Sequence, residues 1–270
     1  MFCITGVMAQ LCALRVACQH RAECQVACHP SSHLILHEAH NTNVKHWFSL
    51  VPLGSPHQVL TADDLIHYPD PIQALIYELP MREIGGQMPS FEALAQIKHW
   101  AKQRDVHLHM DGARLWEAAA GYGRPLAEVC DGFDSVYVSF YKGMGALSGA
   151  MLAGDHGFIQ QARLDMQRVG GNVYRRAPYL VSIARQFDQR LAALPDYIAL
   201  TKRIVAQLRA YPCFTVHPLT PQCNLFHVHL PIAVDKALKI RDDMAKRHRV
   251  WLFERIQESP LPNQCYFEWY

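Results

Sequence analysis

Two charged side chains in this sequence interrupt apolar stretches that have the composition of buried strands. Asp111 interrupts "VHLHMDGARLW" (106–116), and Lys142 interrupts "SVYVSFYKGMGALSGAML" (135–152), 31 positions further on (142 − 111 = 31). Burial lowers the pKa of a lysine, so that its amine becomes a nucleophile that can form a Schiff base. A surface lysine ahead of a loop is the ordinary alternative, and for Lys142 taken alone it is the better interpretation.

The neighbourhood of these two residues favours a shared site. Arg114 lies three residues after Asp111, and "TGVMAQ" (5–10) reads as a tight turn that opens a helix. Backbone N–H groups at the start of a helix bind anions such as phosphate. A lysine for a Schiff base, an acid that keeps a pyridine nitrogen protonated and an anion-binding turn are the parts of a pyridoxal phosphate site. We therefore expect the chain to bind pyridoxal phosphate.

The elements that must position these groups alternate between strand and helix. Strand patterns occupy 24–28, 75–79, 105–110 and 133–140, and helical periodicity occupies 8–18 and 113–123. Ser90 is a plausible N-cap for a further helix with an apolar face of Leu94, Ile97, Trp100 and Ala101. This order predicts an α/β fold with a mostly parallel sheet, helices on both faces and active groups at the carboxyl ends of the strands.

The pattern also predicts a division of the chain into parts. We expect a large cofactor-binding domain over 1–178, linking helices over 179–212 with breaks at Pro178 and Pro195, and a small α+β domain over 213–270. In the small domain the strand candidates are "NLFHVHL", "VWLF" and the final "QCYFEWY", and the helix candidate is "AVDKALKIRDDMAKRH". A chain that ends on an aromatic strand would leave an apolar edge uncovered, so this domain reads as incomplete.

Composition excludes several classes of partner. The 26 basic and 24 acidic residues give a net charge of +2 and are spread along the chain, which is not the electrostatic footprint of a nucleic-acid or membrane-surface protein. No apolar run reaches the roughly 18 residues that a membrane helix needs, and the start lacks a basic signal-peptide region. The nine cysteines form no CxxC pair, so we expect most to be buried apolar residues of a cytoplasmic protein.

A zinc site is the alternative for one histidine-rich segment. His33 and His37 are four residues apart, as helical metal ligands would be, and the segment also contains Cys24, Cys28, His29 and His40. Pro30 and two serines break a helix here and spoil that geometry. A strand followed by a loop, without a metal, is the favoured interpretation.

Three of these segments carry a family resemblance. "HMDGARLW" (109–116), "YKGMGALSGAMLAG" (141–154) and "TGVMAQLCALRV" (5–16) resemble the low-specificity threonine aldolases, which belong to the beta-eliminating lyase group of fold type I pyridoxal phosphate enzymes. The resemblance runs with few breaks from about Phe2 to Tyr270. Tyr141, before the lysine, stands where the family generally has serine.

The resemblance implies a role for each candidate residue. Lys142 would form the Schiff base, Asp111 would pair with the ring nitrogen, and Arg114 would hold the cofactor and face the substrate carboxylate. His33, in "SSHLILHE", matches a histidine that stacks on the cofactor ring and serves as a base, and the phosphate would be lined by Thr5, Gly6 and Val7. The implied reaction is cleavage of a β-hydroxy-α-amino acid, threonine or allo-threonine, to glycine and an aldehyde, in a homo-oligomer.

The sequence also departs from the family pattern. Val7 replaces a second hydroxyl of the phosphate turn, and family members begin before Met1 and continue past Tyr270, so the chain reads as truncated at both ends. The later family region carries an arginine for the substrate carboxylate, and no residue here matches it. Arg175 and Arg176 lie one position away from another expected phosphate contact. Another lyase on the same cofactor, or a family member with little activity, therefore stay open as alternatives.

Overall fold

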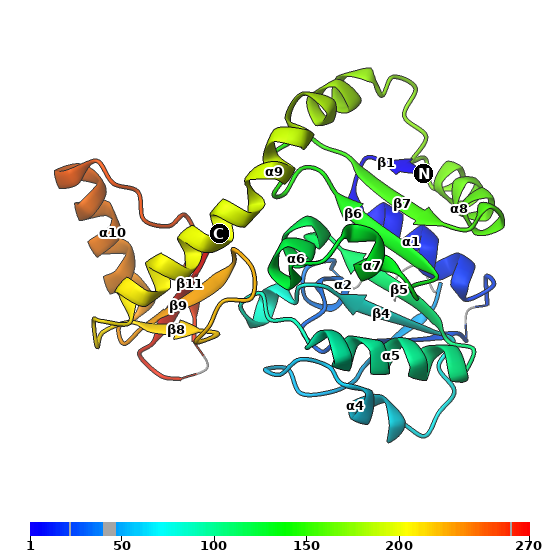
Figure 1. Ribbon diagram of the computed structural model, residues 1–270, viewed down its shortest axis with the longest axis horizontal. Coiled ribbons are helices and arrows are strands. Elements are labelled where there is room, and N and C mark those ends of the chain that lie inside the picture. Colours follow the sequence, from blue (N-terminus) through cyan, green and yellow to red (C-terminus); the bar gives the residue numbers. More distant parts are fainter. Residues whose placement is uncertain (22, 40–46, 260) are drawn as a thin grey trace.

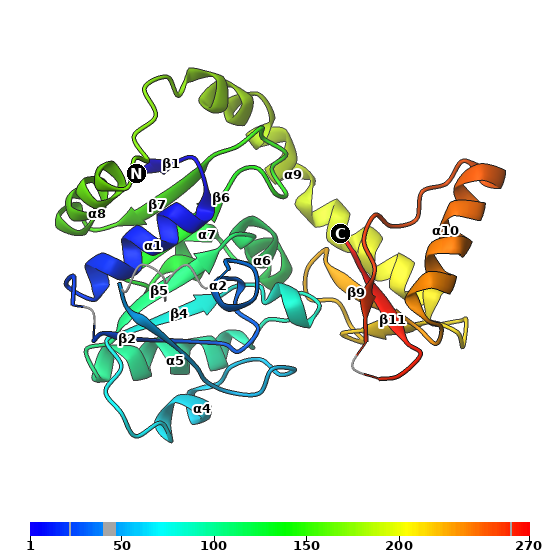
Figure 2. The ribbon, with the colours of Figure 1, turned by 180° about the vertical axis from the view of Figure 1, so that it is seen from behind.

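The computed structural model describes residues 1–21, 23–39, 47–259 and 261–270. It contains a seven-stranded sheet and a separate four-stranded sheet, and the long helix α9 (Ala177–Leu208) runs from one to the other (Figures 1 and 2).

The large sheet is mostly parallel, as the alternation of strands and helices predicts. Its strands follow the order β1-β7-β6-β5-β4-β2-β3. β3, β2, β4, β5 and β6 are parallel neighbours, whereas β7 is antiparallel to both of its neighbours, β6 and β1. The strands are β1 (Phe2–Cys3), β2 (Gln25–Cys28), β3 (Ser49–Pro52), β4 (Ala74–Glu78), β5 (His107–Gly112), β6 (Ser135–Ser139) and β7 (Ala150–Gly154). The carboxyl ends of β4, β5 and β6 therefore meet at one edge.

Helices cover both faces because the side chains of each strand alternate between two apolar clusters. In β4, Leu75 and Tyr77 join the cluster under α5 (Phe91–Gln103) and α6 (Leu115–Tyr122), whereas Ala74 and Ile76 join a cluster that α1 (Gly6–Ala17) covers. The other helices of this part are α2 (His33–Leu36), α4 (Ala62–Ile66), η1 (Arg82–Ile84), α7 (Leu126–Cys130) and α8 (His156–Arg168).

Helix α5 begins where its sequence predicts. Ser90 is its N-cap, and the Ser90 hydroxyl accepts a hydrogen bond from the Ala93 amide at 3.1 Å. The predicted apolar face is buried: Leu94, Ile97, Trp100 and Ala101.

Helix α9 corrects the predicted break at Pro195. The helix is continuous from Ala177 to Leu208, and Pro178 lies in its first turn, where the missing amide costs nothing. Pro195 removes one hydrogen bond from the helix interior, but the neighbouring Leu194 is buried in the large core, and Val205 is buried in the core of the small sheet. Packing at both ends holds the helix across the proline. The domain boundaries at 178 and 212 stay predictions.

The small sheet corrects two further expectations. Its order is β10-β11-β9-β8, so the final strand β11 (Cys265–Trp269) lies inside the sheet, between β10 (Gln257–Glu258) and β9 (Phe226–Leu230), and is not a bare edge. Residues 250–253 form no strand, although helix α10 (Val234–His248) ends near the predicted position. The apolar run at 250–253 contributes Phe253 to the core instead. The fourth strand is β8 (Thr215–His217).

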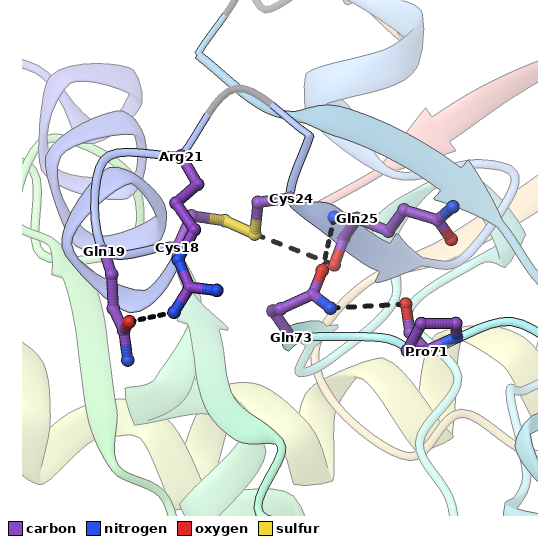
Figure 3. Close-up of a disulfide and its surroundings, with 7 residues drawn as sticks. All are labelled: Cys18, Gln19, Arg21, Cys24, Gln25, Pro71 and Gln73. Carbon is purple, nitrogen blue, oxygen red and sulfur yellow. Dashed lines mark hydrogen bonds between the residues drawn. A yellow bond between two sulfur atoms is a disulfide. The ribbon is translucent and has the colours of Figure 1, made fainter.

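A disulfide joins Cys18 to Cys24, which the sequence did not predict (Figure 3). Cys18 caps the end of α1, and the chain turns back at once into β2, which brings the two Cα atoms to 5.5 Å. Most of the other cysteines are buried, as expected for small apolar residues: Cys3, Cys12, Cys28, Cys223 and Cys265.

None of the helices in the described part of the chain combines the length and the apolar character that crossing a bilayer requires.

Candidate active site

Asp111 lies near the end of β5 and is almost completely buried. Its Oδ2 accepts a hydrogen bond from Gln10 Nε2 at 2.8 Å, and its Oδ1 accepts one from the Ala113 amide at 3.1 Å. Burial raises the pKa of the Asp111 carboxyl, while the nearby charge of Lys142 opposes that rise. The predicted position of this acid at a strand end is confirmed.

Lys142 follows β6 by three residues and lies at the same edge of the sheet. Burial lowers the pKa of its amine, and the charge of Asp111 acts in the opposite direction. The amine forms no hydrogen bond or ion pair with any residue that the structure describes. A partly buried amine with a lowered pKa and no such partner is a nucleophile.

A third ionisable group, Glu78, belongs to this edge and was missed from the sequence. It ends β4 and lies opposite Asp111 in the parallel register, and its Oε1 accepts the Arg82 amide at 3.0 Å. Burial, followed by the negative charge of Asp111, raises the pKa of Glu78 to about 8. The signal was available, because Glu78 follows the apolar run "ALIY" just as Asp111 follows its own strand.

His33 begins a one-turn helix, α2, whereas the sequence predicted a loop. Ser32 and the following apolar residues allow this turn despite Pro30. His33 Nδ1 lies 3.1 Å from Glu38 Oε1, and the ring is tilted against that of His37 at 5.1 Å between centroids. Burial, and then the charge of Lys142, lowers the pKa of His33 to about 4. His33 is therefore neutral at pH 7 and within electrostatic reach of the lysine.

The turn at the start of α1 is built as predicted, but its groups have protein partners. Thr5 is the N-cap, and its hydroxyl accepts a hydrogen bond from the Met8 amide at 3.3 Å. The Gly6 amide donates to the Tyr141 hydroxyl at 3.3 Å, and that hydroxyl lies 3.2 Å from the hydroxyl of Tyr137. The Val7 side chain packs against the apolar cluster between α1 and β2.

Gly6 is required for a steric reason that the sequence did not reveal. A Cβ at this position would lie 1.9 Å from the Tyr137 hydroxyl oxygen. Tyr137 is buried on β6, opposite Asp111, so its ring passes directly under the turn. The glycine thus lets α1 approach β6 closely and brings the turn next to the acid.

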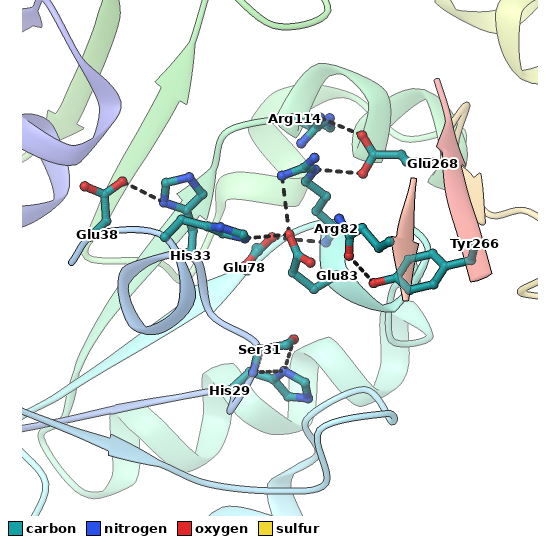
Figure 4. A network of polar contacts seen from close by, with 12 residues as sticks. His29, Ser31, His33, Glu38, Glu78, Arg82, Glu83, Arg114, Tyr266 and Glu268 are labelled. Atoms are coloured by element: carbon teal, nitrogen blue, oxygen red, sulfur yellow. Dashed lines mark hydrogen bonds and ion pairs between the residues drawn. The ribbon is translucent and has the colours of Figure 1, made fainter. Parts of the chain in front are cut away.

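Arg114 starts α6 and is 8% exposed. Its Nη2 lies 3.9 Å from Glu268 Oε1 (Figure 4). Its guanidinium lies 4.8 Å from the centroid of the Tyr270 ring. Its Nε has no hydrogen-bond partner among the described residues. Arg82 reaches the same Glu268, with its Nε 2.7 Å from Oε2. A guanidinium this buried and this poorly paired suits an incoming carboxylate.

These residues fit pyridoxal phosphate. The buried Asp111 carboxyl has room for one more donor beside Gln10 and Ala113, as a pyridinium N–H would supply. The Lys142 amine has no protein partner in the described chain, and the Gly6 amide donates only to a neutral hydroxyl. The protein thus has a complementary group for each part of the cofactor: Asp111 for the ring nitrogen, Lys142 for the aldehyde and the Gly6 amide for the phosphate.

Two other places are candidates for a ligand: the histidine-rich segment for which zinc is the alternative, and a groove at the opposite ends of the strands. Cys24 is in the disulfide, Cys28 Sγ contacts the Val51 carbonyl at 3.9 Å, and His40 lies outside the described residues. The described residues contain no group of three or more potential metal ligands in one place. A groove of about 1370 Å³ lies at the opposite ends of the strands, near Val106 and Asp134, and contains none of the residues predicted for the cofactor site.

Known proteins with this architecture support the family resemblance. The profile of the beta-eliminating lyase family matches residues 1–231. The low-specificity L-threonine aldolase of Eremothecium gossypii is 32% identical over 180 residues, which are 64% of this chain and 47% of that protein. The alanine racemase of Cochliobolus carbonum is 33% identical over 198 residues, 69% of this chain and 49% of that protein. The chain therefore spans about half the length of these curated relatives.

A solved structure agrees with these sequence matches. The crystal structure of a proposed L-allo-threonine aldolase from Listeria monocytogenes superposes with a TM-score of 0.94 and 35% identity, covering 99% of this chain and 74% of that one. The fold is that of the fold type I pyridoxal phosphate enzymes, as predicted. The family profile and the superposition lead to one conclusion: this chain belongs to the beta-eliminating lyase family.

Proposed function

We propose that the protein is a pyridoxal phosphate-dependent aldolase that cleaves a β-hydroxy-α-amino acid, threonine or allo-threonine, to glycine and an aldehyde. The observation that carries the proposal is the convergence of Asp111, Lys142 and Arg114 at one edge of the sheet, in a family whose relatives include threonine aldolases. Because the chain spans about half of the curated relatives, the activity is tested on this chain itself.

Each group of the cofactor has a holder in this proposal. Asp111 would hold the protonated ring nitrogen, Lys142 would hold the aldehyde carbon covalently, and the phosphate would take the Gly6 amide and the Tyr141 hydroxyl. Tyr141 supplies a hydroxyl in a turn where Val7 has none. When bound, the cofactor supplies an electron-withdrawing ring for the bond that breaks.

The remaining chemistry belongs to side chains of this protein. Arg114 would orient the substrate through its carboxylate. His33 is neutral at pH 7 because its pKa is lowered to about 4, and its Nδ1–H would donate a hydrogen bond to Glu38 Oε1, 3.1 Å away. That arrangement leaves the lone pair of His33 Nε2 free to accept the β-hydroxyl proton of the substrate.

The experiment that tests this proposal has two stages. The purified protein is titrated with pyridoxal phosphate, reduced with borohydride and digested to map the labelled residue, which should be Lys142. The loaded protein is then incubated with threonine and with allo-threonine, and glycine and acetaldehyde are measured. Labelling spread over surface lysines, or no glycine from either substrate, would contradict the proposal.

A second candidate function is racemisation of an amino acid, favoured by the alanine racemase relative. The lysine and the acid specify the cofactor and not the bond that breaks, so other lyase reactions of the family share this logic. Incubation of L-alanine in deuterated water separates the candidates, because a racemase produces deuterated D-alanine and an aldolase produces glycine from threonine.

We also propose that the protein works in the cytoplasm as a homo-oligomer. Outside the Cys18–Cys24 disulfide, the buried cysteines Cys3, Cys28, Cys223 and Cys265 favour a reducing compartment, and the family resemblance supports the assembly. Sedimentation velocity of the loaded protein tests the oligomeric state.

A further inference from the structure

A row of polar side chains runs along β5 on the face that α1 covers. Alternate residues of a strand point to the same face, so His107, His109 and Asp111 share one face. Tyr137, opposite Asp111 on β6, packs in one apolar cluster with Ala13 of α1. Helix α1 therefore lies over this row (Figure 2).

Ser135 connects the first two members of the row. It lies opposite His109 in the register of β5 and β6, and its Oγ is 2.7 Å from His109 Nδ1 and 2.8 Å from His107 Nε2. Ser135 and His109 are buried. His107 stacks on Phe158 and lines the groove at the opposite ends of the strands. A polar link thus leads from that groove into the interior, in the direction of Asp111.

Two buried polar atoms on this face are left without a partner. Gln10 Nε2 donates to Asp111 Oδ2 at 2.8 Å, but neither Gln10 Oε1 nor His109 Nε2 has a hydrogen-bond partner among the described residues. Gln10 is 3% exposed and His109 is 0% exposed, and buried polar groups are nearly always hydrogen-bonded. Alternate residues of a strand are about 6.6 Å apart, a span that the Gln10 amide and one water can bridge.

The Ser135 hydroxyl decides in which direction this link donates, because its one proton goes to one histidine nitrogen and it accepts from the other. Burial, followed by the charge of His107, lowers the pKa of His109 to about 3, so the His109 ring has a single N–H proton at pH 7. If Ser135 donates to His109 Nδ1, that proton is on Nε2 and can be donated to the Gln10 carbonyl. If His109 Nδ1 donates to Ser135, Nε2 is a bare acceptor, and two acceptors cannot pair. Only the first arrangement satisfies both unpaired atoms.

We propose that Ser135, His109 and Gln10 form a hydrogen-bond relay in which every donor points toward Asp111, with His109 Nε2–H reaching Gln10 Oε1 directly or through one bound water. The relay holds the Asp111 carboxyl in its ionised form. Burial raises the pKa of that carboxyl, and the hydrogen bond from Gln10 is among the contacts that oppose the rise. The role of the relay rests on the proposed function, in which the Asp111 carboxylate holds the protonated ring nitrogen of the cofactor. His109 is a positioning residue, because it acts through Gln10 and Asp111.

The first experiment determines the tautomer of His109 at pH 7 in the protein without added cofactor. Long-range ¹H–¹⁵N correlation spectra of protein with ¹⁵N-labelled histidine distinguish a proton on Nε2 from one on Nδ1, and the signals missing from His109→Gln assign the ring. The relay requires the proton on Nε2. In Ser135→Ala, which removes the donor to Nδ1, the ring should populate both tautomers. A proton on Nδ1 in the wild type overturns the proposal.

The second experiment compares the affinity for pyridoxal phosphate with the affinity for its deaza analogue, which carries a C–H group in place of the ring nitrogen. Only pyridoxal phosphate can donate an N–H to the Asp111 carboxylate, so the ratio of the two affinities reports the state of that carboxylate. His109→Leu should lower the ratio about fivefold, the loss expected for one net hydrogen bond. His109→Gln keeps an amide donor in place of Nε2–H and should recover most of the ratio.

The ratio separates the relay from a role in packing. If His109 only fills space in the core, His109→Leu should change both affinities by the same factor, and a constant ratio overturns the proposal. Ser135→Ala removes a single hydroxyl and should lower the ratio about twofold, so it provides the test if His109→Leu does not fold. His99→Leu is the matched control, because His99 is exposed on α5, and it should keep the wild-type ratio.

The two experiments keep the relay apart from the proposed function. If the protein binds no pyridoxal phosphate, the proposed function fails, and the tautomer of His109 still decides whether the relay exists. If threonine is cleaved but His109 carries its proton on Nδ1, the relay is wrong and the proposed function stands.

Discussion

At the scale of single residues, the site places one buried acid, Asp111, and two partly buried groups, Glu78 and Lys142, on neighbouring strand ends. Glu78 and Asp111 face each other across β4 and β5, and burial raises the pKa of both carboxyl groups while it lowers the pKa of Lys142. These groups titrate as a unit, because each charge stabilises or destabilises the others. The protonation state of each of these three groups therefore depends on the other two.

The Tyr141 hydroxyl should contribute directly to cofactor affinity. Tyr141→Phe removes the acceptor of the Gly6 amide and the hydroxyl proposed to bind the phosphate. A hydrogen bond to a charged group contributes about 1.5–3 kcal/mol, so the dissociation constant for pyridoxal phosphate should rise about tenfold or more. Tyr174→Phe is the control, because Tyr174 is 95% exposed. Equal affinities of Tyr141→Phe and wild type, measured by absorbance titration, would exclude this role.

His33 should act as a base over an unusually wide pH range. His33→Asn should lower kcat for threonine cleavage by roughly 10²–10⁴-fold, the usual contribution of a general base. Because the pKa of His33 is lowered to about 4, the base form persists as pH falls from 7, and its loss should centre near pH 4. His99→Asn, an exposed change on α5, should leave kcat unchanged. A wild-type rate that halves near pH 6.5 would argue against His33.

At the scale of elements, the site depends on how closely helices approach strand ends. Gly6 lets α1 pass over Tyr137 of β6, and Ser90 starts α5 under β4 and β5. Gly6 acts because it has no side chain, and Ser90 acts as an N-cap. Both act on backbone position, which is what sets the distances within the site.

The cap of α5 should contribute measurable stability. Ser90→Ala removes the hydroxyl that accepts the Ala93 amide at 3.1 Å, and loss of an N-cap costs about 1 kcal/mol. Urea unfolding followed by circular dichroism should show that decrease in the free energy of unfolding. Ser49→Ala, at an exposed position of the edge strand β3, should have little effect. Equal decreases in both variants would show that the cap is not the cause.

At the scale of the whole molecule, the two sheets are joined by helix α9 and by polar contacts that include Arg82 with Glu268 and Gln87 with His217. The face of the small sheet toward these contacts carries His217, His227 and His229 in register, with Tyr266 stacked on His229. Burial lowers the pKa of all three histidines, that of His227 to about 4.

His227 should make the molecule less stable in acid. Its folded pKa lies below the unfolded value of about 6.5, so the unfolded chain binds the proton more readily as pH falls through that window. Relative to His227→Phe, which cannot titrate, the wild type should therefore lose about 1.4 kcal/mol of unfolding free energy per pH unit between pH 6.5 and 5. Urea titrations of both proteins at pH 7, 6 and 5 measure the gap. A constant gap would mean that folding does not change the pKa of His227.

Local sequence determined the parts of this protein that depend on periodicity and caps. The strands that lead to Asp111 and Lys142, the Ser90 helix with its buried face, the turn at Thr5 and Gly6 and the parallel alternation could all be predicted, because each depends on residues close together along the chain. The family resemblance assigned roles to these residues for the same reason, since its motifs are short.

Only the tertiary structure decided which distant groups meet. Tyr141 reaches Gly6 across 135 positions, and Arg82 reaches Glu268 across 186. The inner position of β11 depends on strand pairing in the same way, since register and neighbours are not encoded within one strand. Burial also shifts the pKa values of ionisable groups in the site. The direction of each shift depends on surroundings that exist only in the folded chain.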